Sequence, residues 1–355
     1  MQELGVAVIG AGNIGSLRAH ILSQMPQVNF LAVADIDEGK AQRLAEQCRA
    51  DLWSTNYEEV VSRTEVNAVS VSSGEEEHLA PALAAARLGK PLLVEKPLAM
   101  TLADADRILE TARASGSPVF VGYTQRFRRR FLVIKEQVRR GSIGNVVNVF
   151  GKIYLNKMAA EIVIARAPST TPSINTMTYL VDLVLWYLEG KRPTEVFARS
   201  GFFVFKQRYA APDFTWVIVT FDDGSVATMG VTWLIPEKHP AYSAIMELEL
   251  FGTEGLISVD DSHRDFLVVP EQPVQFQSWK PPLDIAFMGT AMPGEWALGE
   301  FWGPMKEETS SFISAVTAGR PAPLATGEQG RQALELTLAA DRSAQEGRPV
   351  GLPLT

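Results

Sequence analysis

The sequence predicts two domains: an α/β domain with a doubly wound parallel sheet, followed by an α+β domain built on an antiparallel sheet. Over the first third of the chain, apolar strand-like segments alternate with helical segments, and a glycine-rich turn joins the first strand to the first helix. Later strand-like segments follow one another with few helices between them. A length of 355 residues fits about two domains, and we expect them to span residues 1–122 and 123–355.

The composition is that of a globular protein, with 46% hydrophobic and 21% charged residues. A net charge of −8 argues against a general affinity for nucleic acids or membrane surfaces. The single cysteine, Cys48, cannot form an internal disulfide, which suits a reducing compartment. The chain begins without a basic leader and contains no apolar run of roughly 18 residues, so we expect a cytoplasmic protein.

Residues 4–22 are predicted to form a strand, a glycine-rich turn and a helix with the spacing G-x-G-x-x-G. In this pattern, the first glycine permits a tight turn, the second lets the backbone approach a pyrophosphate, and the third lets helix and strand pack closely. The free N–H groups at the start of the helix favour phosphates. The residues predicted to contact a dinucleotide at this turn are Gly10, Gly12, Asn13, Ile14 and Gly15.

The second predicted strand, residues 29–37, contains Asp35 and Ile36 near its end. A carboxylate at this point can bind both hydroxyls of an adenosine ribose and would repel a 2′-phosphate. Asp35 and Ile36 are therefore predicted cofactor contacts, and NAD is favoured over NADP. The alternative is that Asp35 only caps the helix that follows.

The alternation continues with predicted strands over residues 67–73, 91–97 and 118–123, separated by helices. Ligands bind doubly wound sheets at the carboxyl ends of the strands. His78 opens the helix after the first of these strands, and both a cofactor contact and a purely structural role are open for it. The further predicted cofactor contacts at these strand ends are Ser72, Ser73, His78, Glu95 and Lys96.

Several motifs are spread over nearly the whole chain: GAGNIG, HLAPALAAARLGKPLLVEKPL, GYTQRF, GSIGNV, VTFDDGSVATM, LELFGTEGLISVD and AADRSAQEGRPVGLPL. With these motifs, the chain resembles the glucose–fructose oxidoreductase and inositol dehydrogenase (Gfo/Idh/MocA) family. The resemblance implies an open, mostly antiparallel sheet in the second domain, with a face that often serves as an oligomer interface, and hence a homodimer or homotetramer. It also implies that Lys96 lies near the nicotinamide and the reacting carbon, and that the Lys96–Pro97 bond can be cis.

The second predicted domain begins with a helix over residues 129–141 and ends with two helices over 304–319 and 327–347. The Asp-Gly pair in FDDGS predicts a hairpin turn between two strands. Residues 276–304 have no clear period and are rich in aromatic residues, which suits either a wall for a sugar-like ligand or an oligomer contact. The predicted strands cover residues 145–155, 195–205, 214–221, 225–235, 244–252, 255–260 and 265–270.

A further helix is predicted over residues 173–188, begun by Thr171 and Pro172. In many dehydrogenases of the family that the chain resembles, the corresponding helix carries Asp, three residues and then His. This chain has Asn175 and Tyr179 at those places. The polar or amphipathic residues that share one face of the predicted helix are Asn175, Tyr179, Asp182 and Trp186.

This substitution changes the chemistry that the helix can perform. An amide cannot take up a proton, so we expect Asn175 to position the substrate or to orient Tyr179. Tyr179 is the predicted acid–base group, and the ammonium of Lys96 would lower the pKa of its phenol. The alternative is that Tyr179 only packs in the core and that catalysis is altered or absent.

Three residues are weaker candidates for substrate contacts: Arg126, Tyr154 and Asp182. Arg126 begins the arginine-rich stretch 126–130, which suits a solvated helix face or, less simply, an anionic substrate such as a sugar acid. Tyr154 lies on a predicted strand together with Lys152 and Lys157. For Asp182, structural pairing is as good an interpretation as substrate binding.

We therefore predict an NAD-dependent oxidoreductase that transfers hydride between nicotinamide and a carbon of a sugar, polyol or related hydroxy or keto compound. Two alternatives remain open: a dinucleotide-binding sensor without dehydrogenase activity, and an enzyme that uses transient oxidation for elimination or glycoside cleavage. We predict a small sugar-like substrate, no metal site, and no nucleic-acid or membrane partner.

Overall fold

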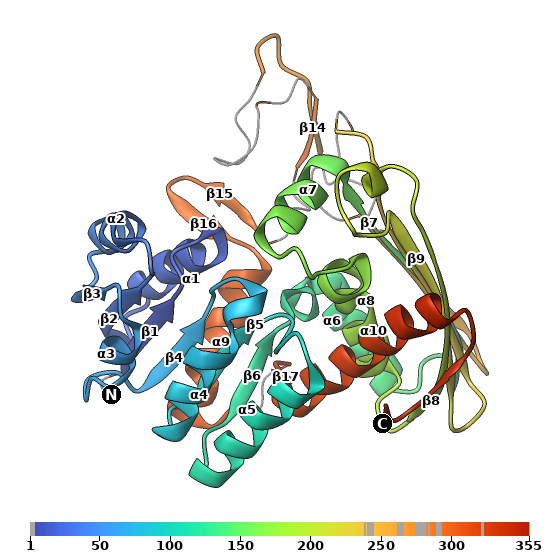
Figure 1. Cartoon of the computed structure of the whole chain (residues 1–355), viewed down its shortest axis with the longest axis horizontal. Helices are drawn as coiled ribbons and strands as arrows, with labels where there is room; N and C mark the ends of the chain where they lie inside the picture. The colour runs from blue at the N-terminus through green and yellow to red at the C-terminus, as the bar shows by residue number, and fades with distance from the viewer. Residues whose placement is uncertain are drawn as a thin grey trace. The chain divides into compact units, whose positions relative to one another are not determined.

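The computed structural model describes residues 4–237, 239, 245–260, 266–273, 282, 285–288, 293–320 and 323–354 (Figure 1). Contacts divide the chain into two compact units, the first made of residues 1–127 and 296–334, and the second of residues 128–295 and 335–355. This division differs from the single boundary that the sequence predicted after residue 122, because a late segment returns to the first unit.

The first unit is built on sheet A, which has the order β17-β6-β5-β4-β1-β2-β3. Pairing is parallel throughout, except for β17 at the edge. The doubly wound prediction is confirmed, although the sequence reasoning had not identified the short β3, its following helix α3, or the edge strand. The strands are β1 (Leu4–Ile9), β2 (Val28–Ala34), β3 (Leu52–Ser54), β4 (Ala68–Val71), β5 (Leu92–Glu95), β6 (Val119–Gly122) and β17 (Ala325–Thr326).

Two groups of helices accompany sheet A. Helix α1 lies beside α2 and α9, and helix α4 lies beside α3 and α5. The strand order turns back between β1 and β4, which defines the switch point where doubly wound sheets bind ligands. The helices are α1 (Asn13–Ser23), α2 (Glu38–Cys48), α3 (Tyr57–Val61), α4 (Leu79–Arg87), α5 (Leu102–Ser115) and α9 (Pro304–Ala318).

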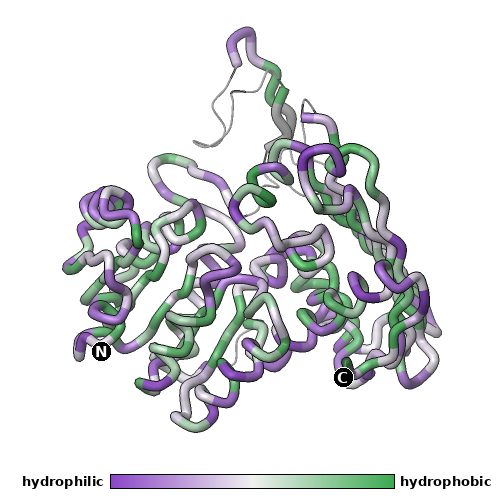
Figure 2. Tube along the Cα trace, in the orientation of Figure 1, coloured by the Kyte–Doolittle hydropathy of each residue, from purple (hydrophilic) through white to green (hydrophobic). Residues whose placement is uncertain are grey.

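Local sequence explains where several of these elements begin and end. Asp37 starts α2 by accepting a hydrogen bond from the N–H of Lys40, and Thr101 starts α5 in the same way with Asp104. Helix α5 ends at Gly116, whose φ of +72° is in the left-handed region. Strand β1 is buried along its whole length, and Figure 2 shows the strands of sheet A mainly in the colour of hydrophobic residues.

The second unit is built on sheet B, with the order β12-β11-β7-β10-β9-β8-β18. Only the pair β7–β10 is parallel, so the prediction of a mostly antiparallel sheet is confirmed. Gly224, with a φ of +83°, makes the predicted hairpin turn between β9 and β10. The strands are β7 (Val146–Asn156), β8 (Pro193–Gly201), β9 (Phe214–Phe221), β10 (Val226–Ile235), β11 (Ile245–Gly252), β12 (Leu256–Asp260) and β18 (Val350–Gly351).

The second unit departs from the sequence prediction at one helix and at one strand. Lys157, expected on a strand, is the first residue of α7 (Lys157–Arg166), which Asn156 caps through its side chain. The strand predicted over 195–205 ends at Gly201, and a 3₁₀ turn over Phe205–Gln207 follows. Helices α6 (Arg129–Arg139) and α10 (Gly327–Glu346) confirm the prediction, with α10 crossing the boundary between the units.

Two small strand pairs complete the described chain: β13 (Phe266–Val268) with β14 (Ala286–Met288), and β15 (Glu295–Ala297) with β16 (Glu300–Trp302). Residues 276–281, 283–284 and 289–292 of the aromatic segment 276–304 lie outside the described residues, so its predicted role stays a prediction. Within the described part of the chain, no helix has the length and hydrophobicity needed to span a bilayer.

Candidate functional site

The glycine-rich turn after β1 has the geometry that its sequence predicts. Gly10 has a φ of +102°, which a residue with a side chain rarely adopts. A Cβ on Gly15 would lie 1.8 Å from the carbonyl oxygen of Gly10, so only glycine allows α1 to approach the turn this closely. At Gly12 a Cβ would meet no atom within 4 Å, which leaves open space above the turn.

Asp35 connects the end of β2 to this turn. Its Oδ2 accepts a hydrogen bond from the N–H of Ala11 at 2.6 Å, and its Oδ1 accepts one from the N–H of Asp37 at 2.9 Å. Since Asp37 caps α2, the alternative of Asp35 as the helix cap is wrong. The adjacent Ile36 is 93% exposed.

These features fit a bound dinucleotide. Helix α1 begins at Asn13 without a side-chain cap, so its first N–H groups are available to phosphate oxygens. The open space at Gly12 admits a pyrophosphate, and the partly exposed carboxylate of Asp35 stands at the strand end where a ribose is held in this fold. Gly10, Gly12, Gly15 and Asp35 are therefore the residues that would hold NAD.

The ends of β4 and β5 lie at the same edge of sheet A. The Oγ of Ser72 lies 3.2 Å from that of Ser70, and the backbone of Ser72 and Ser73 is where a Cβ on Gly10 would collide. Lys96 follows β5 and is partly exposed, and its peptide bond to Pro97 is cis, as the resemblance implied. The structure thus brings the predicted serine contacts to the glycine turn.

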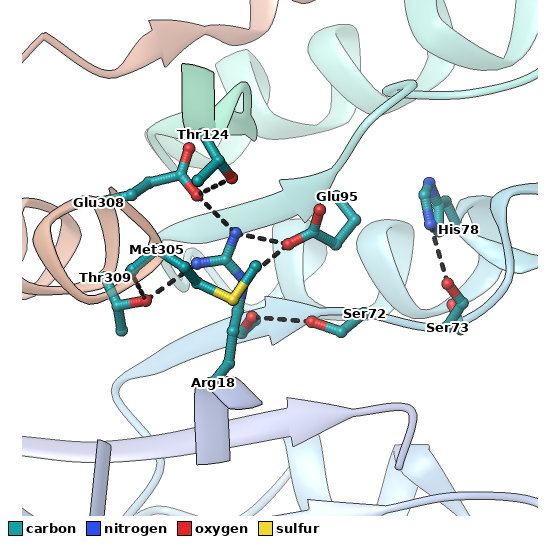
Figure 3. A network of polar contacts seen from close by, with 10 residues as sticks. Arg18, Ser72, Ser73, His78, Glu95, Thr124, Met305, Glu308 and Thr309 are labelled. Carbon is teal, nitrogen blue, oxygen red and sulfur yellow. Dashed lines mark hydrogen bonds and ion pairs between the residues drawn. The ribbon is translucent and has the colours of Figure 1, made fainter. Parts of the chain in front are cut away.

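His78 has a structural environment. It is buried, and its Nδ1 lies 2.8 Å from the carbonyl oxygen of Pro97. Its Nε2 lies 3.2 Å from the carbonyl oxygen of Ser73 (Figure 3). Burial lowers the pKa of His78 below its usual range, although both carbonyls favour the protonated ring. These contacts connect the ends of β4 and β5, which is a positioning role; a direct contact with the cofactor stays a prediction.

Glu95 belongs to a buried charged network that the sequence did not reveal (Figure 3). The guanidinium of Arg18 on α1 is fully buried and donates from Nε to Glu95 at 2.6 Å and from Nη2 to Glu308 on α9 at 2.7 Å. It also donates to the hydroxyl of Thr309 at 2.9 Å, while Thr124 donates to Glu308 at 2.9 Å. Glu95 therefore anchors the strand end from which Lys96 projects; a cofactor contact for Glu95 itself stays a prediction.

This network holds one cation and two carboxylates. Burial raises the pKa of Glu308 to about 7; the charge of Arg18 opposes this rise, and that of Glu95 adds to it. The second oxygen of Glu308, Oε1, is buried without a hydrogen-bond partner. Protonation of Glu308 would leave Arg18 and Glu95 as a neutral pair.

In the second unit, the helix predicted over 173–188 is not one continuous α-helix. A π-helical turn covers Ser173–Met177, and α8 (Thr178–Tyr187) follows it. The helix does start as expected, since the hydroxyl of Thr171 accepts a hydrogen bond from the N–H of Ile174 at 3.2 Å. The π turn changes the angular spacing between Asn175 and Tyr179, so the prediction of one regular polar face was wrong. Such turns occur frequently at functional sites.

The π turn rests on a hydrogen-bond chain from sheet B. The indole Nε1 of Trp233 on β10 donates to the hydroxyl of Thr176 at 2.8 Å, and that hydroxyl donates to Oδ1 of Asn175 at 3.2 Å. All three side chains are buried. In α8, Tyr179 is partly exposed, and Asp182 is buried, which favours the structural interpretation of this carboxylate.

A carboxylate also supports the start of this helix. Asp341 on α10 accepts a hydrogen bond from the hydroxyl of Thr171 at 2.6 Å. Burial raises the pKa of Asp341 to about 6, although the bond from Thr171 acts against this rise. Thr171 therefore connects the helix start to α10, a contact between residues too distant in sequence for a motif to indicate.

Tyr154 is not on the side of sheet B where α8 packs. The register places Tyr154 opposite Thr232, on the face that also carries Lys152 and Phe150, whereas Leu180 of α8 packs against Gly151 on the other face. Lys152 forms an ion pair with Glu247 at 2.6 Å and lies over the Tyr154 ring. Tyr154 is therefore separated from Asn175 by the sheet itself.

Arg126, in the first unit, is buried and donates to the side chain of Gln329 at 3.0 Å, which gives it a structural partner. Arg128 lies over the ring of Phe131 in the second unit. Across the described residues, no group of three or more histidine, cysteine, aspartate or glutamate side chains could hold a metal ion.

Sequence reasoning missed Arg18, Glu308, Trp233 and Asp341. Their partners lie far away in sequence; Arg18 and Glu308 are 290 residues apart. A buried arginine on α1 gives no local signal, because the same residue on an exposed helix face would look identical in sequence.

Comparison with known proteins agrees with the fold and with the dinucleotide site. Residues 4–123 match an oxidoreductase family with an NAD-binding Rossmann fold, and residues 131–258 match a GFO/IDH/MocA C-terminal domain. The chain is 26% identical to a myo-inositol 2-dehydrogenase of Thermotoga maritima, with 98% of both chains covered. It is 24% identical to a scyllo-inositol 2-dehydrogenase (NAD(+)) of Bacillus subtilis, with 99% of this chain and 97% of the relative covered.

Solved structures show the same fold at lower identity. GenD2 from gentamicin A biosynthesis, in complex with NAD, has a TM-score of 0.83 at 23% identity and covers 100% of this chain and 97% of its own. The scyllo-inositol dehydrogenase from Lactobacillus casei with bound NAD(H) and scyllo-inositol has a TM-score of 0.82 at 16% identity, with 99% of both chains covered. With matched models over both parts of the chain and full-length relatives, this protein belongs to the GFO/IDH/MocA family of NAD-dependent oxidoreductases.

Proposed function

We propose that this chain oxidises a secondary hydroxyl of a cyclic polyol of the inositol type, or reduces the corresponding ketone. The observation that carries this proposal is the glycine turn with Asp35 at the end of the next strand, which suits NAD, in a chain that matches two inositol dehydrogenases along their full length. In this reading, the first unit binds the dinucleotide, and the second supplies substrate contacts and association with other copies.

Three residues carry the chemistry in this proposal. NAD supplies the hydride acceptor for the carbon that bears the hydroxyl, and its reduced form supplies the hydride for the ketone. Tyr179 takes the hydroxyl proton during oxidation and returns it during reduction. The Lys96 ammonium stabilises negative charge on the same oxygen and favours the phenolate form of Tyr179. Asn175 holds the substrate in place.

The test of this proposal is the reduction of NAD by purified protein with a panel of inositols and other polyols, and oxidation of NADH with the matching ketones. Turnover on a polyol supports the proposal. NAD binding without turnover on any member of the panel would instead support the sensor, and products of elimination or glycoside cleavage would support the redox-assisted alternative.

Variants of the two catalytic residues sharpen the test. Lys96→Met should lower kcat/KM at least about tenfold, equal to roughly 1.4 kcal/mol of transition-state stabilisation. Tyr179→Phe should lower kcat more than it weakens NAD binding. Wild-type kinetics in either variant would reject the role assigned to that residue.

Matched controls exist for both variants. Lys206→Met removes an exposed lysine from the 3₁₀ turn of the second unit and should leave kcat/KM unchanged. Tyr187→Phe removes a phenol from the same helix as Tyr179, but one whose hydroxyl donates to the carbonyl oxygen of Phe131 at 3.1 Å. It should lower stability and leave turnover intact.

We also propose that copies of the chain associate through the outer face of sheet B. Phe150, Trp216 and Ile218 lie on this face and are each between 44% and 47% exposed, and large apolar side chains gathered on one exposed face are typical of an interface. Light scattering should show a homodimer or homotetramer, and the double substitution Trp216→Lys and Ile218→Lys should dissociate it.

The single buried cysteine, Cys48, is compatible with the cytoplasm as the compartment.

A further inference from the structure

Buried polar contacts hold the main chain on both sides of Lys96. On one side, the carboxylate of Glu95 accepts a hydrogen bond from Nε of Arg18 on α1 at 2.6 Å. On the other side, Nδ1 of His78, at the start of α4, lies 2.8 Å from the carbonyl oxygen of Pro97. Arg18, Glu95 and His78 are all buried, so water does not compete for these contacts. The two residues that flank Lys96 are therefore tied to two different helices of the first unit.

The guanidinium of Arg18 sets the distances between three elements of this unit. Its N–H donors lie in one plane and point in fixed directions. They reach Glu95 at the end of β5 at 2.6 Å, and Glu308 and Thr309 on α9 at 2.7 and 2.9 Å. Because Arg18 itself belongs to α1, this one planar group fixes the end of β5 relative to two helices.

Strand β6 leaves room for this contact at Gly122. A Cβ on Gly122 would lie 3.0 Å from Nη2 of Arg18 and 3.0 Å from Oε2 of Glu95. The guanidinium and the carboxylate thus lie directly over the backbone of β6, where the side chain of any other residue would push one of them aside. Close packing below and hydrogen bonds above leave the Glu95 side chain little freedom to move.

Helix α1 also connects this anchor to the glycine turn. The helix begins at Asn13, whose neighbouring N–H groups would hold phosphate oxygens, and Arg18 follows five residues later. An α-helix rises 1.5 Å per residue, so roughly 8 Å of rigid helix separates the two points. The same element would therefore hold the pyrophosphate of NAD at its start and the residue before Lys96 one turn further on.

We propose that Arg18 is a positioning residue for the Lys96 ammonium, and that it sets the place of this ammonium relative to bound NAD by tying Glu95 to α1. The inference rests on the proposed function, in which Lys96 stabilises negative charge on the substrate oxygen. A displaced ammonium would stabilise that charge less, because the attraction falls with distance. Arg18 should thus affect the reaction only through Lys96, without contacting the substrate.

A double-mutant cycle tests this assignment, with kcat/KM measured on the best polyol of the panel. Arg18→Lys keeps a buried cation but lacks the planar fork, and should lower kcat/KM about tenfold. In the Lys96→Met background, the same change should lower kcat/KM less than about twofold, because the group that Arg18 positions is already gone. The dissociation constant for NAD, measured by calorimetry, should stay at the wild-type value, because Asp35 holds the glycine turn through the N–H of Ala11.

Arg331→Lys is the matched control. Arg331 donates from Nε and Nη2 to the carboxylate of Asp106 on α5, at 2.5 and 3.1 Å, so this is also a forked pair within the first unit, but neither residue flanks Lys96. Its replacement should lower the midpoint of urea unfolding and leave kcat/KM unchanged. If Arg18→Lys fails to fold, Glu95→Asp takes its place in the cycle, since it keeps every charge and withdraws the carboxylate from Arg18 by one methylene.

The outcomes separate this inference from the function on which it rests. Wild-type kcat/KM in Lys96→Met would overturn both, since Lys96 would then have no role to support. A slow Lys96→Met enzyme together with wild-type kcat/KM in folded Arg18→Lys would overturn the inference alone. Losses that multiply in the double variant, or weaker NAD binding in Arg18→Lys, would also overturn it, because Arg18 would then act on the fold or on the glycine turn rather than through Lys96.

Discussion

The two units stabilise their functional residues by different physical means. In the first unit, the strand end that leads to Lys96 is anchored by ionic groups, with Arg18 between Glu95 and Glu308. In the second unit, Asn175 is held by a chain of neutral donors and acceptors that begins at Trp233. Both networks are buried, so the comparison separates the effect of charge from the effect of burial.

The difference affects how much stability each network provides and how that stability depends on pH. Breaking a buried ion pair leaves an uncompensated charge in a medium of low dielectric constant, which costs far more than the loss of a neutral hydrogen bond. A charged network also titrates, so the stability that it provides depends on pH. A neutral network does not titrate in the physiological range, so the stability that it provides should not change with pH there.

The largest expected effect comes from Arg18→Met. This change leaves Glu95 and Glu308 buried without their shared cation and should destabilise the first unit by roughly 3–5 kcal/mol. The midpoint of urea unfolding measures the effect. Arg107→Met is the control, since Arg107 is more than half exposed and its pair with Asp104 should contribute only about 0–1 kcal/mol. Equal losses for both variants would contradict the assigned importance of burial.

An intermediate effect is expected for Trp233→Phe. The phenyl ring fills most of the indole volume but cannot donate to Thr176, so the unfolding free energy should fall by about 1–3 kcal/mol. Because Thr176 and Asn175 do not ionise, the loss should be the same at every pH between 5 and 8. A loss that grew or shrank across this range would show that charged groups contribute to the second network after all.

At acidic pH, Glu308→Gln should change the free energy of unfolding least of the three variants. Its effect should also depend most clearly on pH. The folded protein binds a proton at Glu308 up to about pH 7, whereas the unfolded chain releases it near the ordinary glutamate pKa of 4.5. The wild type should therefore lose stability as pH rises from 4.5 to 7, by at most roughly 3 kcal/mol from this group. The glutamine variant lacks this loss.

The comparison of the two proteins isolates Glu308, because every other titrating group is present in both. Unfolding midpoints at pH 5, 6, 7 and 8 should show the glutamine variant gaining stability relative to the wild type as pH rises. A constant difference across this series would mean that Glu308 stays ionised throughout and that the charged network does not titrate near neutral pH.

Much of the first unit could be predicted from local sequence. The glycine turn works through backbone space within a few residues, so Gly10, Gly12 and Gly15 could be predicted as a tight turn before the structure was known, and Gly10 and Gly15 have the backbone geometry of such a turn. The second unit was less predictable. The alternation of residues in β7 shows that Tyr154 and Gly151 lie on opposite faces, but only pairing with β10 and packing of α8 decide which face is covered.

The sequence by itself determined the strand and helix order of the first unit, the turn that suits a dinucleotide, and the carboxylate at Asp35, because each depends on residues close together in the chain. Only the tertiary structure decided that Arg18 and Glu308 anchor Glu95, and that a hydrogen-bond chain from Trp233 reaches Asn175 through Thr176. The physical reason is that a buried polar group must find its partner wherever the fold brings one, and that partner can be hundreds of residues away.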